Sequence, residues 1–529
     1  MTVTHQTRCL RIEFDYAMLS NTKAEVEGTT LYVSTRGKTD MVSSAHAISS
    51  GLAKDGGLFV PRDFPPVALA EIDAMKGKPY GDRAVQILSR YLTDFSEEEL
   101  RECVSAAYSK EKFGGFAAPL HLLKKDTDIL ELWHGPTSAF KDMALQILPH
   151  FLTRAVRKTG EQKKSVILVA TSGDTGKAAM AGFSDVPDTE VIVFYPHGGV
   201  SDAQRLQMTT QRGNNVHAVA VEGNFDDAQT GVKLLFGKAE LAAELKEQGC
   251  AFSSANSINW GRLVPQIVYY FSAYADAVEK GRIQNGTEIV FSVPTGNFGD
   301  ILAGYYAKLM GLPVKKFICA SNSNNVLTDF INTGTYDRNR EFHRTISPSM
   351  DILVSSNLER LLYEKTEHNS EKINEWMDAL QEKGAYSIGR DIQDAVVSDF
   401  FGAWIDEIET QETISDVFNN YGYVLDPHSA VAYKALQKYR LMTSDETYGI
   451  VLSTASPFKF SDVVLRALYP DDYEGKVLTA FEAMDELSQK ARIDIPQGLK
   501  ELRGLPERES DIVAPGEMEK EVKKILAID

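Results

Sequence analysis

The chain has 529 residues, of which 43% are hydrophobic and 25% are charged, a composition typical of a globular protein with roughly two or three domains. Its formal net charge of -18 disfavours binding to nucleic acid or to an anionic membrane, because both need a basic surface. An anionic small molecule would therefore need a locally basic pocket.

The four cysteines lie far apart and form no C-x-x-C pair, so the sequence predicts neither a zinc site nor a disulfide framework. No apolar run reaches the roughly 18 residues that a membrane span requires. Glu13 and Asp15 are out of place in a signal or transit peptide. We expect a cytoplasmic protein that holds no metal.

The N-terminal part of the chain divides into two segments. Residues 1–27 show no clear periodicity and are expected to be an extension. Residues 28–125 are expected to form a small domain with a strand at Leu31–Arg36 and helical structure over 81–109. In that helical stretch, Ser96 and Glu99 have the spacing of a capping box.

Residues 126–483 are expected to form the main body, because apolar runs with strand character alternate there with helical segments. This alternation is typical of an α/β fold with a mostly parallel sheet. Pro149 lies within the helical pattern of 140–158 and should kink or break that helix. The predicted strands are Val166–Ala170, Val191–Phe194, Val216–Val221, Ile289–Val293 and Gly449–Leu452.

Two segments depart from this alternation. Residues 338–410 are charged and rich in helical patterns, with helices predicted at Asn374–Lys383 and Asp391–Ile408, so they are expected to be an insertion in the main body. Residues 484–529 are polar and broken by three prolines, and they are expected to be a peripheral C-terminal arm that ends in a helical run, Glu517–Ile528.

A candidate reactive lysine lies in the segment ELWHGPTSAFKD at 131–142, where a strand leads into a helix. Lys141 falls in the first helical turn, whose partial positive charge disfavours an ammonium group, so its pKa should fall. A lysine with a depressed pKa can act as a nucleophile or a Schiff-base partner. The alternative from the local pattern is a solvated surface lysine.

A glycine-rich turn after a second predicted strand has the form of a phosphate site. The strand EIVFSV leads through PTGNFGD, residues 294–300, directly into a helix. Gly296 and Gly299 would let backbone N–H groups approach an anion closely, and the helix dipole would favour it. A plain glycine-rich turn between strand and helix explains the same residues.

Three further segments carry polar residues. In TSGDTGK at 171–177 the glycine spacing excludes a Walker A phosphate loop. In NSINWGR at 256–262, Arg262 could grip a phosphate with two parallel hydrogen bonds or form a structural salt bridge. Thr454 follows the strand at 449–452, where a serine and threonine turn is common.

The segment HGPTSAFKDMALQ resembles, position by position, the cofactor-lysine segment of threonine synthases, which are pyridoxal-phosphate (PLP) enzymes. The similarity is to the long form found in fungi and bacteria. It extends in the family's order over most of residues 28–480, through TSGDTGKAAMAGF, YPHGGVSDAQRLQMTT, NSINWGRLVPQIVYYF, PTGNFGDILAGYYAK and SPSMDILVSSNLERLL.

The resemblance implies a tryptophan-synthase-β-like (fold type II) core that holds PLP between two α/β subdomains. Lys141 would be its Schiff-base lysine and the catalytic base. Gly296, Asn297, Phe298 and Gly299 would bind the PLP phosphate, with Asp300 beside them, and Thr454 would face the pyridine nitrogen. Ser172, Gly173, Asp174 and Thr175 would bind the substrate carboxylate. Asn259 and Arg262 are further candidates for substrate binding.

The implied reaction converts O-phospho-L-homoserine and water to L-threonine and phosphate by β,γ-replacement, in a monomer or homodimer. Two alternatives stay open. One is a PLP-dependent phospholyase or dehydratase that releases a 2-keto acid, and the other is a non-catalytic threonine synthase-like binding protein. The presence of both Lys141 and the GNFG loop disfavours the second alternative.

Overall fold

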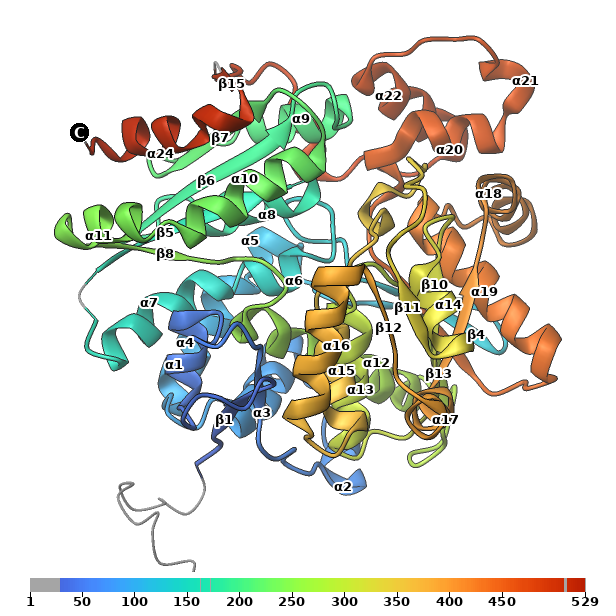
Figure 1. Cartoon of the computed structure of the whole chain (residues 1–529). Coiled ribbons are helices and arrows are strands. Elements are labelled where there is room, and N and C mark those ends of the chain that lie inside the picture. Colours follow the sequence, from blue (N-terminus) through green and yellow to red (C-terminus); the bar gives the residue numbers. More distant parts are fainter. Residues whose placement is uncertain (1–28, 162, 172, 509–510, 529) are drawn as a thin grey trace, which may run out of the picture.

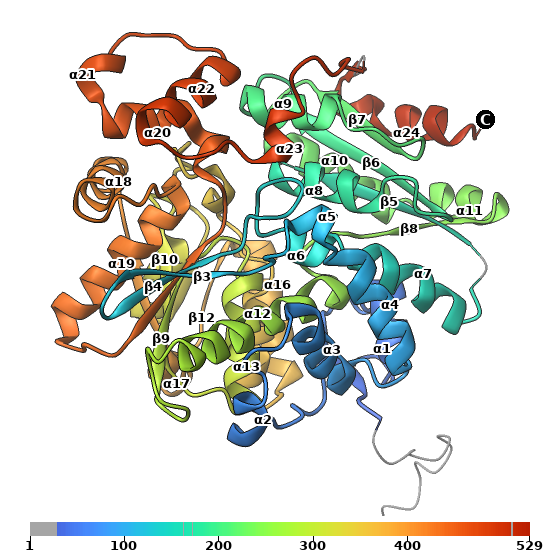
Figure 2. The same cartoon turned by 180° about the vertical axis from the view of Figure 1, so that it is seen from behind.

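Two mostly parallel sheets, together with the helices that pack on and between them, make up most of the computed structural model (Figures 1 and 2). The structure describes residues 29–161, 163–171, 173–508 and 511–528, so the predicted extension 1–27 lies outside the described residues. The α/β class and the mostly parallel strands that the sequence predicts are confirmed.

A small helical unit precedes the sheets. Its two strands, β1 (Tyr32–Ser34) and β2 (Phe59–Pro61), pair antiparallel. The capping box at Ser96 is confirmed at the start of α4, where Ser96 and Glu99 bond each other's backbone N–H groups. The helices are α1 (Ser44–Ser50), α2 (Leu69–Asp73), α3 (Tyr80–Tyr91), α4 (Glu97–Ala107) and α5 (Lys110–Phe113).

The first sheet has six strands in the order β13-β10-β9-β14-β4-β3, and only β3 runs antiparallel to its neighbour. Successive side chains of a strand point to opposite faces. Phe291 and Val293 therefore pack with the buried helices on one face, while Val290 packs with α19 on the other. The strands are β3 (Leu120–Lys124), β4 (Thr127–Glu131), β9 (Ile289–Pro294), β10 (Val314–Ser321), β13 (Phe400–Trp404) and β14 (Gly449–Ser453).

The second sheet is parallel throughout, in the order β15-β7-β6-β5-β8. Both of its faces are covered, which explains why the sequences of β5 and β6 are almost continuously apolar. The strands are β5 (Lys164–Ala170), β6 (Thr189–Pro196), β7 (Val216–Val221), β8 (Cys250–Ser253) and β15 (Ile512–Val513). The helices around them are α8 (Asp174–Phe183), α9 (Asp202–Thr209), α10 (Phe225–Gly237), α11 (Ala239–Glu247) and α24 (Met518–Leu526).

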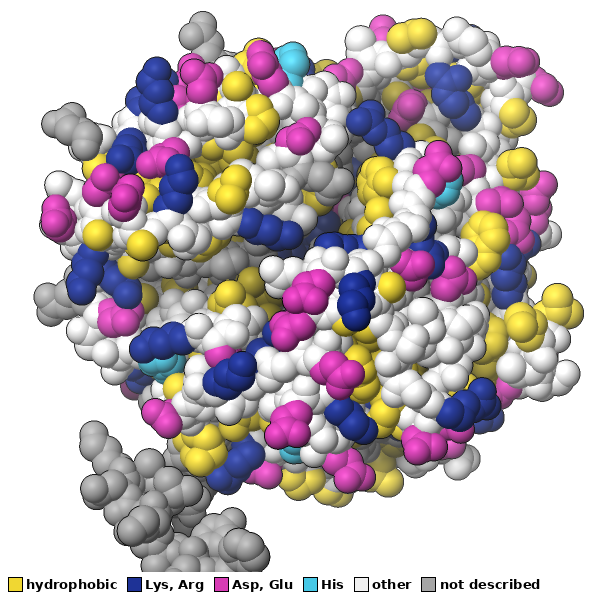
Figure 3. All heavy atoms as spheres, in the orientation of Figure 1, with side chains coloured by type: hydrophobic (Ala, Val, Ile, Leu, Met, Phe, Trp, Pro, Cys, Tyr) yellow, Lys and Arg dark blue, Asp and Glu magenta, His cyan; other side chains and the backbone are white. Residues whose placement is uncertain are grey.

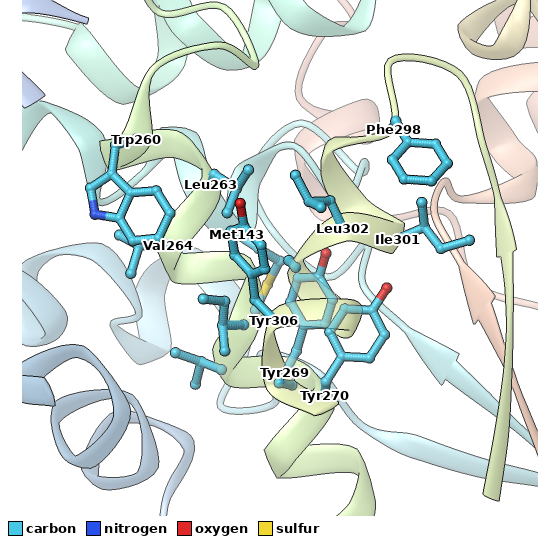
Figure 4. Packing of buried hydrophobic residues seen from close by; sticks show 14 of the residues in the cluster. Met143, Trp260, Leu263, Val264, Tyr269, Tyr270, Phe298, Ile301, Leu302 and Tyr306 are labelled. Carbon is cyan, nitrogen blue, oxygen red and sulfur yellow. The ribbon is translucent and has the colours of Figure 1, made fainter. Parts of the chain in front are cut away.

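The core between the sheets is built on α12 (Trp260–Glu279) and α13 (Gly299–Leu309). Aromatic and aliphatic side chains of both helices pack together with Met143, as Figure 4 shows. The predicted break before Pro149 is confirmed, because α6 (Asp142–Leu145) ends and α7 (Leu148–Lys158) starts afresh with Pro149 in its first turn. Both overall views show α6 near the middle of the molecule (Figures 1 and 2).

The prediction of one helix over Asp391–Ile408 is wrong. Helix α17 (Arg390–Asp399) stops where the sequence becomes FFGAW, and these residues form the edge strand β13, which pairs in parallel with β10. The aromatic residues favour a strand, and Phe400 packs against Phe298 and Phe317. The other helices and strand within 338–410 are α15 (Leu358–Lys365), α16 (Ser370–Lys383) and β12 (Ala385–Ser387), and α14 (Val326–Thr333) and β11 (Thr335–Asp337) directly precede that segment.

The C-terminal part covers the first sheet and then crosses to the second. Strand β15 joins the second sheet beside β7, and Val513, Met518 and Val522 are buried in its core, so the end of the predicted arm is not peripheral. Among the described residues no helix is long and apolar enough to cross a membrane. The helices of this part are α18 (Glu407–Tyr421), α19 (Pro427–Thr443), α20 (Ser461–Leu468), α21 (Pro470–Tyr473), α22 (Ala480–Ala491) and α23 (Gln497–Lys500).

Candidate active site

The predicted site residues follow the carboxyl ends of strands from both sheets: β4, β9 and β14 of the first and β5 of the second. In open α/β sheets, ligands bind at that edge. The surface is hollowed between the part of the molecule that contains the first sheet and the part that contains the second sheet. Lys and Arg side chains are visible in and around the hollow (Figure 3).

Lys141 lies directly before α6 in a buried environment. Its Nζ atom is 3.9 Å from Oδ2 of Asp174, and its side chain is only 12% exposed. Burial lowers the pKa of Lys141 to about 8; the Asp174 carboxylate opposes this change, and the positive charges of Arg262 and Lys459 reinforce it. A substantial fraction of this amine is therefore neutral near physiological pH.

Asp174 is the carboxylate that faces Lys141, and it begins α8 after the β5 loop. Its Oδ1 atom pairs with Nζ of Lys459 at 2.6 Å and accepts from Nε2 of Gln204 at 3.0 Å. Its Oδ2 atom accepts from the Ser349 hydroxyl at 3.2 Å. Burial would raise the pKa of Asp174, but Lys459 and Lys141 outweigh it and hold the pKa well below its usual range.

Ser349 connects this carboxylate to a buried histidine. The backbone N–H of Ser349 donates to Nε2 of His428 at 3.1 Å, so Nε2 is the unprotonated nitrogen. Nδ1 of His428 then donates to Asp426 at 2.7 Å. His428 thus has a structural role, because its hydrogen bond fixes the turn that carries Ser349.

The loop at 296–299 offers backbone donors to an anion. Phe298 adopts the left-handed conformation with φ of 62°, and no side chain caps α13. The carbonyl of Asn297 accepts from both the backbone N–H and the Nδ2 of Asn357, which fixes the loop. Among the described residues, no acceptor is found for the N–H groups of residues 297–299. Such a loop at a helix N-terminus suits a phosphate.

Asp300 turns away from that loop. Its Oδ1 atom accepts hydrogen bonds from the hydroxyls of Tyr269 at 2.5 Å and Tyr270 at 2.8 Å, and burial raises the pKa of Asp300 to about 6. The structure therefore places Asp300 against α12, and this geometry gives no support to the prediction that it contacts a cofactor.

The loop before α8 contains the residues predicted to bind a substrate carboxylate. Ser172 lies outside the described residues. The N–H groups of Gly173 and Gly176 donate to the Thr171 hydroxyl at 2.9 and 3.0 Å, so they are already used within the loop. Among the described residues, no acceptor is found for the N–H of Thr175.

Thr454 lies beside the Lys141 segment. Its carbonyl accepts from the N–H of Phe140 at 2.8 Å, and the next residue, Ala455, forms an isolated bridge with Ala139. Thr454 is 6% exposed, and among the described residues its hydroxyl has no hydrogen-bond partner. A ligand that enters the hollow could therefore bond to it.

Asn259 and Arg262 differ in their availability. Asn259 caps α12, and its Nδ2 atom donates to the carbonyls of Ile48 and Ser254 at 3.1 Å, so its amide is used by the fold and the prediction of substrate binding gains no support. Arg262 donates from Nη1 to the Ala255 carbonyl at 2.7 Å. It forms no ion pair within the described part of the chain, and burial lowers its pKa to about 10.

Sequence reasoning missed Lys459, Gln204 and Ser349, which surround Asp174. Lys459 follows Thr454 closely, in the turn Pro457–Phe460, but its partner lies far away in the sequence. A lysine inside the apolar run PFKF was the only available signal, because a fully buried lysine needs a charged partner.

Comparison with known proteins agrees with this geometry. Residues 129–389 match the family described as pyridoxal-phosphate dependent enzyme. The fold is thus that of the PLP-dependent enzymes of fold type II. Residues 31–108 and 429–525 match the N-terminal and C-terminal families of threonine synthase. The chain belongs to the threonine synthase family.

Similar proteins include threonine synthase from Pseudomonas aeruginosa, 39% identical over 441 residues that cover 82% of this chain and 90% of that protein. Human threonine synthase-like 1 is 41% identical over 435 residues, which cover 80% of this chain but only 58% of the relative. The crystal structure of PLP-bound threonine synthase from Brucella melitensis has a TM-score of 0.82 and 35% identity, covering 94% of this chain and 99% of the other.

The residues present fit PLP. The buried lysine has a lowered pKa, the 297–299 loop has free N–H donors, and the Thr454 hydroxyl is unpaired within the described structure. These are the amine, the anion site and the polar contact that an aldehyde with a phosphate and a ring nitrogen requires.

Proposed function

We propose that the protein is a threonine synthase, which converts O-phospho-L-homoserine and water to L-threonine and phosphate as the last step of threonine biosynthesis. The observation that supports this proposal is that one buried site contains two separate groups of hydrogen-bond donors suited to an anion. One is the 297–299 loop, and the other is Arg262, which has no carboxylate partner among the described residues. The reaction needs both, because cofactor and substrate each carry a phosphate.

Lys141 would hold PLP covalently and then move protons. The bound cofactor supplies the electron sink that stabilises negative charge on the substrate carbons. Lys141, when free of the cofactor, would take the proton from the substrate α-carbon, and a pKa of about 8 suits a base that works near neutral pH. Asp174 would hold the resulting ammonium close to the substrate.

The other residues would bind and orient the ligands. The N–H groups of residues 297–299 would hold the PLP phosphate, and Thr454 would face the pyridine nitrogen. Arg262 would bind the substrate phosphate with the N–H groups that have no acceptor in the described part of the chain. The α8 loop would bind the substrate carboxylate.

Product analysis tests this proposal. Purified protein with bound PLP would be incubated with O-phosphohomoserine, and threonine, phosphate and 2-oxobutyrate would be measured. Threonine equal in amount to phosphate supports the synthase. Phosphate with 2-oxobutyrate in place of threonine would instead identify a phospholyase, and no turnover would favour a binding protein. Lys141→Ala is the matched control.

A further inference from the structure

Lys459 is a buried lysine that none of the roles above uses. Its side chain is 0% exposed and lies in a 3-10 turn, η2 (Pro457–Phe460). Nζ pairs with Oδ1 of Asp174 at 2.6 Å and donates to the carbonyl of Thr137 at 3.0 Å. It therefore ties together the turn after Thr454, the α8 loop and the segment that carries Lys141.

Stability alone gives a weak reason for this arrangement. Burying an ammonium and a carboxylate costs solvation free energy, and replacing such a pair with apolar residues of similar volume often leaves stability unchanged or improves it. A methionine at position 459 would fill similar space. The charge of Lys459 needs another explanation, and its partner suggests one.

The two oxygens of Asp174 face different groups. Oδ1 points to Lys459 and Gln204, while Oδ2 accepts from Ser349 and lies 3.9 Å from Nζ of Lys141. The short contact to Lys459 thus fixes the carboxylate in the orientation that presents Oδ2 to Lys141.

We propose that Lys459 is a positioning residue: it holds the Asp174 carboxylate in place beside Lys141 and neutralises part of its negative charge, so that Asp174 favours the ammonium form of Lys141 less than an unpaired carboxylate would. The proposal rests on the proposed function, in which Lys141 is the lysine that binds PLP.

Several charged groups from different elements surround the two lysines. Lys141 faces Asp174 on α8, Arg262 on α12 and Lys459 on η2. Lys459 also lies near Asp142 and Lys177, which respond to its charge; Asp142 in addition accepts from the Thr137 N–H and hydroxyl. Without Lys459, a repelling cation is removed and Asp174 has Lys141 as its nearest cation. Both changes stabilise the ammonium form of Lys141.

The test measures covalent attachment of PLP to the cofactor-depleted full-length chain as a function of pH. Nζ of Lys141 attacks the PLP aldehyde only as the neutral amine, and the C=N bond forms with loss of one water, which changes the visible absorbance. We expect the rate for the wild type to rise with pH through about 8. Lys459→Met should move this midpoint up by about one pH unit and slow attachment at pH 7 about tenfold.

Two further variants complete the design. Lys459→Arg keeps the charge and should keep the midpoint within about 0.3 pH unit of the wild type. If Lys459 had only a structural role, keeping its charge would not be expected to preserve the midpoint. Lys459→Gln removes the charge but can still donate to Thr137 and Asp174, so it decides the question if Lys459→Met does not fold.

A folded neutral variant with an unchanged midpoint would overturn the proposal. Failure of both neutral variants to fold, when Lys459→Arg folds, would also overturn it, because the charge would then be required for folding. Borohydride reduction and peptide mapping separate this from the proposed function: PLP attached to a lysine other than Lys141 would contradict the site assignment itself.

Discussion

At the scale of single residues, the pKa of Lys141 is lowered as the sequence predicts, but the predicted cause explains only part of the change. The sequence predicts a lowered pKa because the lysine falls at a helix N-terminus. The pKa is lowered to about 8, but α6 has only four residues, so its dipole is small. Burial is the main cause, together with Arg262 and Lys459, which come from distant parts of the chain.

Replacement of Lys141 by alanine should abolish covalent attachment of PLP. We expect the variant to bind PLP only through the phosphate loop and other noncovalent contacts. Turnover should fall at least 1000-fold, because Lys141 would be both the nucleophile that holds PLP and the base. Borohydride reduction followed by peptide mapping measures attachment. Lys177→Met is the control for attachment only: Lys177 is also a buried lysine with a pKa lowered by burial to about 8, but it bonds Gln211, so PLP should still be found on Lys141 in this variant.

Replacement of Thr454 by aspartate should change the products. A carboxylate beside the pyridine nitrogen would raise that nitrogen's pKa and strengthen the electron sink, so fewer electrons would remain to expel the γ-phosphate. We expect phosphate release to slow about tenfold, equal to ~1.4 kcal/mol in activation free energy, with a larger share of keto acid.

Rapid-quench measurement of phosphate and product ratios checks the Thr454 prediction. Thr454→Ser keeps the hydroxyl and should partition like the wild type. An aspartate variant that also keeps the wild-type ratio would show that residue 454 does not face the ring nitrogen.

At the scale of elements, the sequence predicts well wherever the signal is local. The predicted strands that became β5, β6, β7, β9 and β14, the capping box at Ser96 and the break before Pro149 depend on neighbouring residues, and the structure confirms them. Strand β13 was mistaken for helix because its pairing with β10 is a tertiary contact. The network of Asp174 with Lys459 and Ser349 could not be predicted for the same reason, since spacing in the sequence says nothing about contacts between such distant segments.

The phosphate loop offers a matched pair of glycine substitutions. A Cβ atom at position 296 would lie 2.9 Å from the carbonyl oxygen of Ser349, whereas at position 299 the nearest atom is 3.5 Å away. Gly296→Ala must therefore displace Ser349, which holds Asp174. We expect it to weaken PLP binding about tenfold or more, ~1.4 kcal/mol, and Gly299→Ala to stay within about threefold.

Fluorescence titration with PLP would measure both dissociation constants. Equal affinity for the two glycine variants would show that the contact between residue 296 and Ser349 does not support the cofactor site. A loss at Gly299→Ala alone would show that the cofactor contacts Gly299 and that its binding does not depend on the position of Ser349.

At the scale of the whole molecule, charge is distributed unevenly between surface and site. The chain carries a net charge of -18, yet the buried site contains four basic side chains, Lys141, Lys177, Arg262 and Lys459, and two carboxylates, Asp142 and Asp174. A surplus of buried cations disfavours the folded protein, so an anion that binds there should stabilise it. This links the stability of the fold directly to the ligands of the site.

We therefore expect inorganic phosphate to raise the thermal midpoint of the PLP-bound protein more than chloride does at equal ionic strength. A ligand at 100 times its dissociation constant adds about 2.7 kcal/mol to the free energy of unfolding.

Phosphate also stabilises proteins generally by exclusion from their surface, so the increment in thermal midpoint that phosphate causes must be compared between variants. Arg262→Met should lose the site-specific part, because Arg262 is a buried cation without a carboxylate partner in the described structure. Arg503→Met is the control, since Arg503 pairs with Asp485 on the surface and should keep the full increment. Differential scanning fluorimetry over a phosphate series measures all three proteins, and an equal increment in each would mean that phosphate does not bind at Arg262.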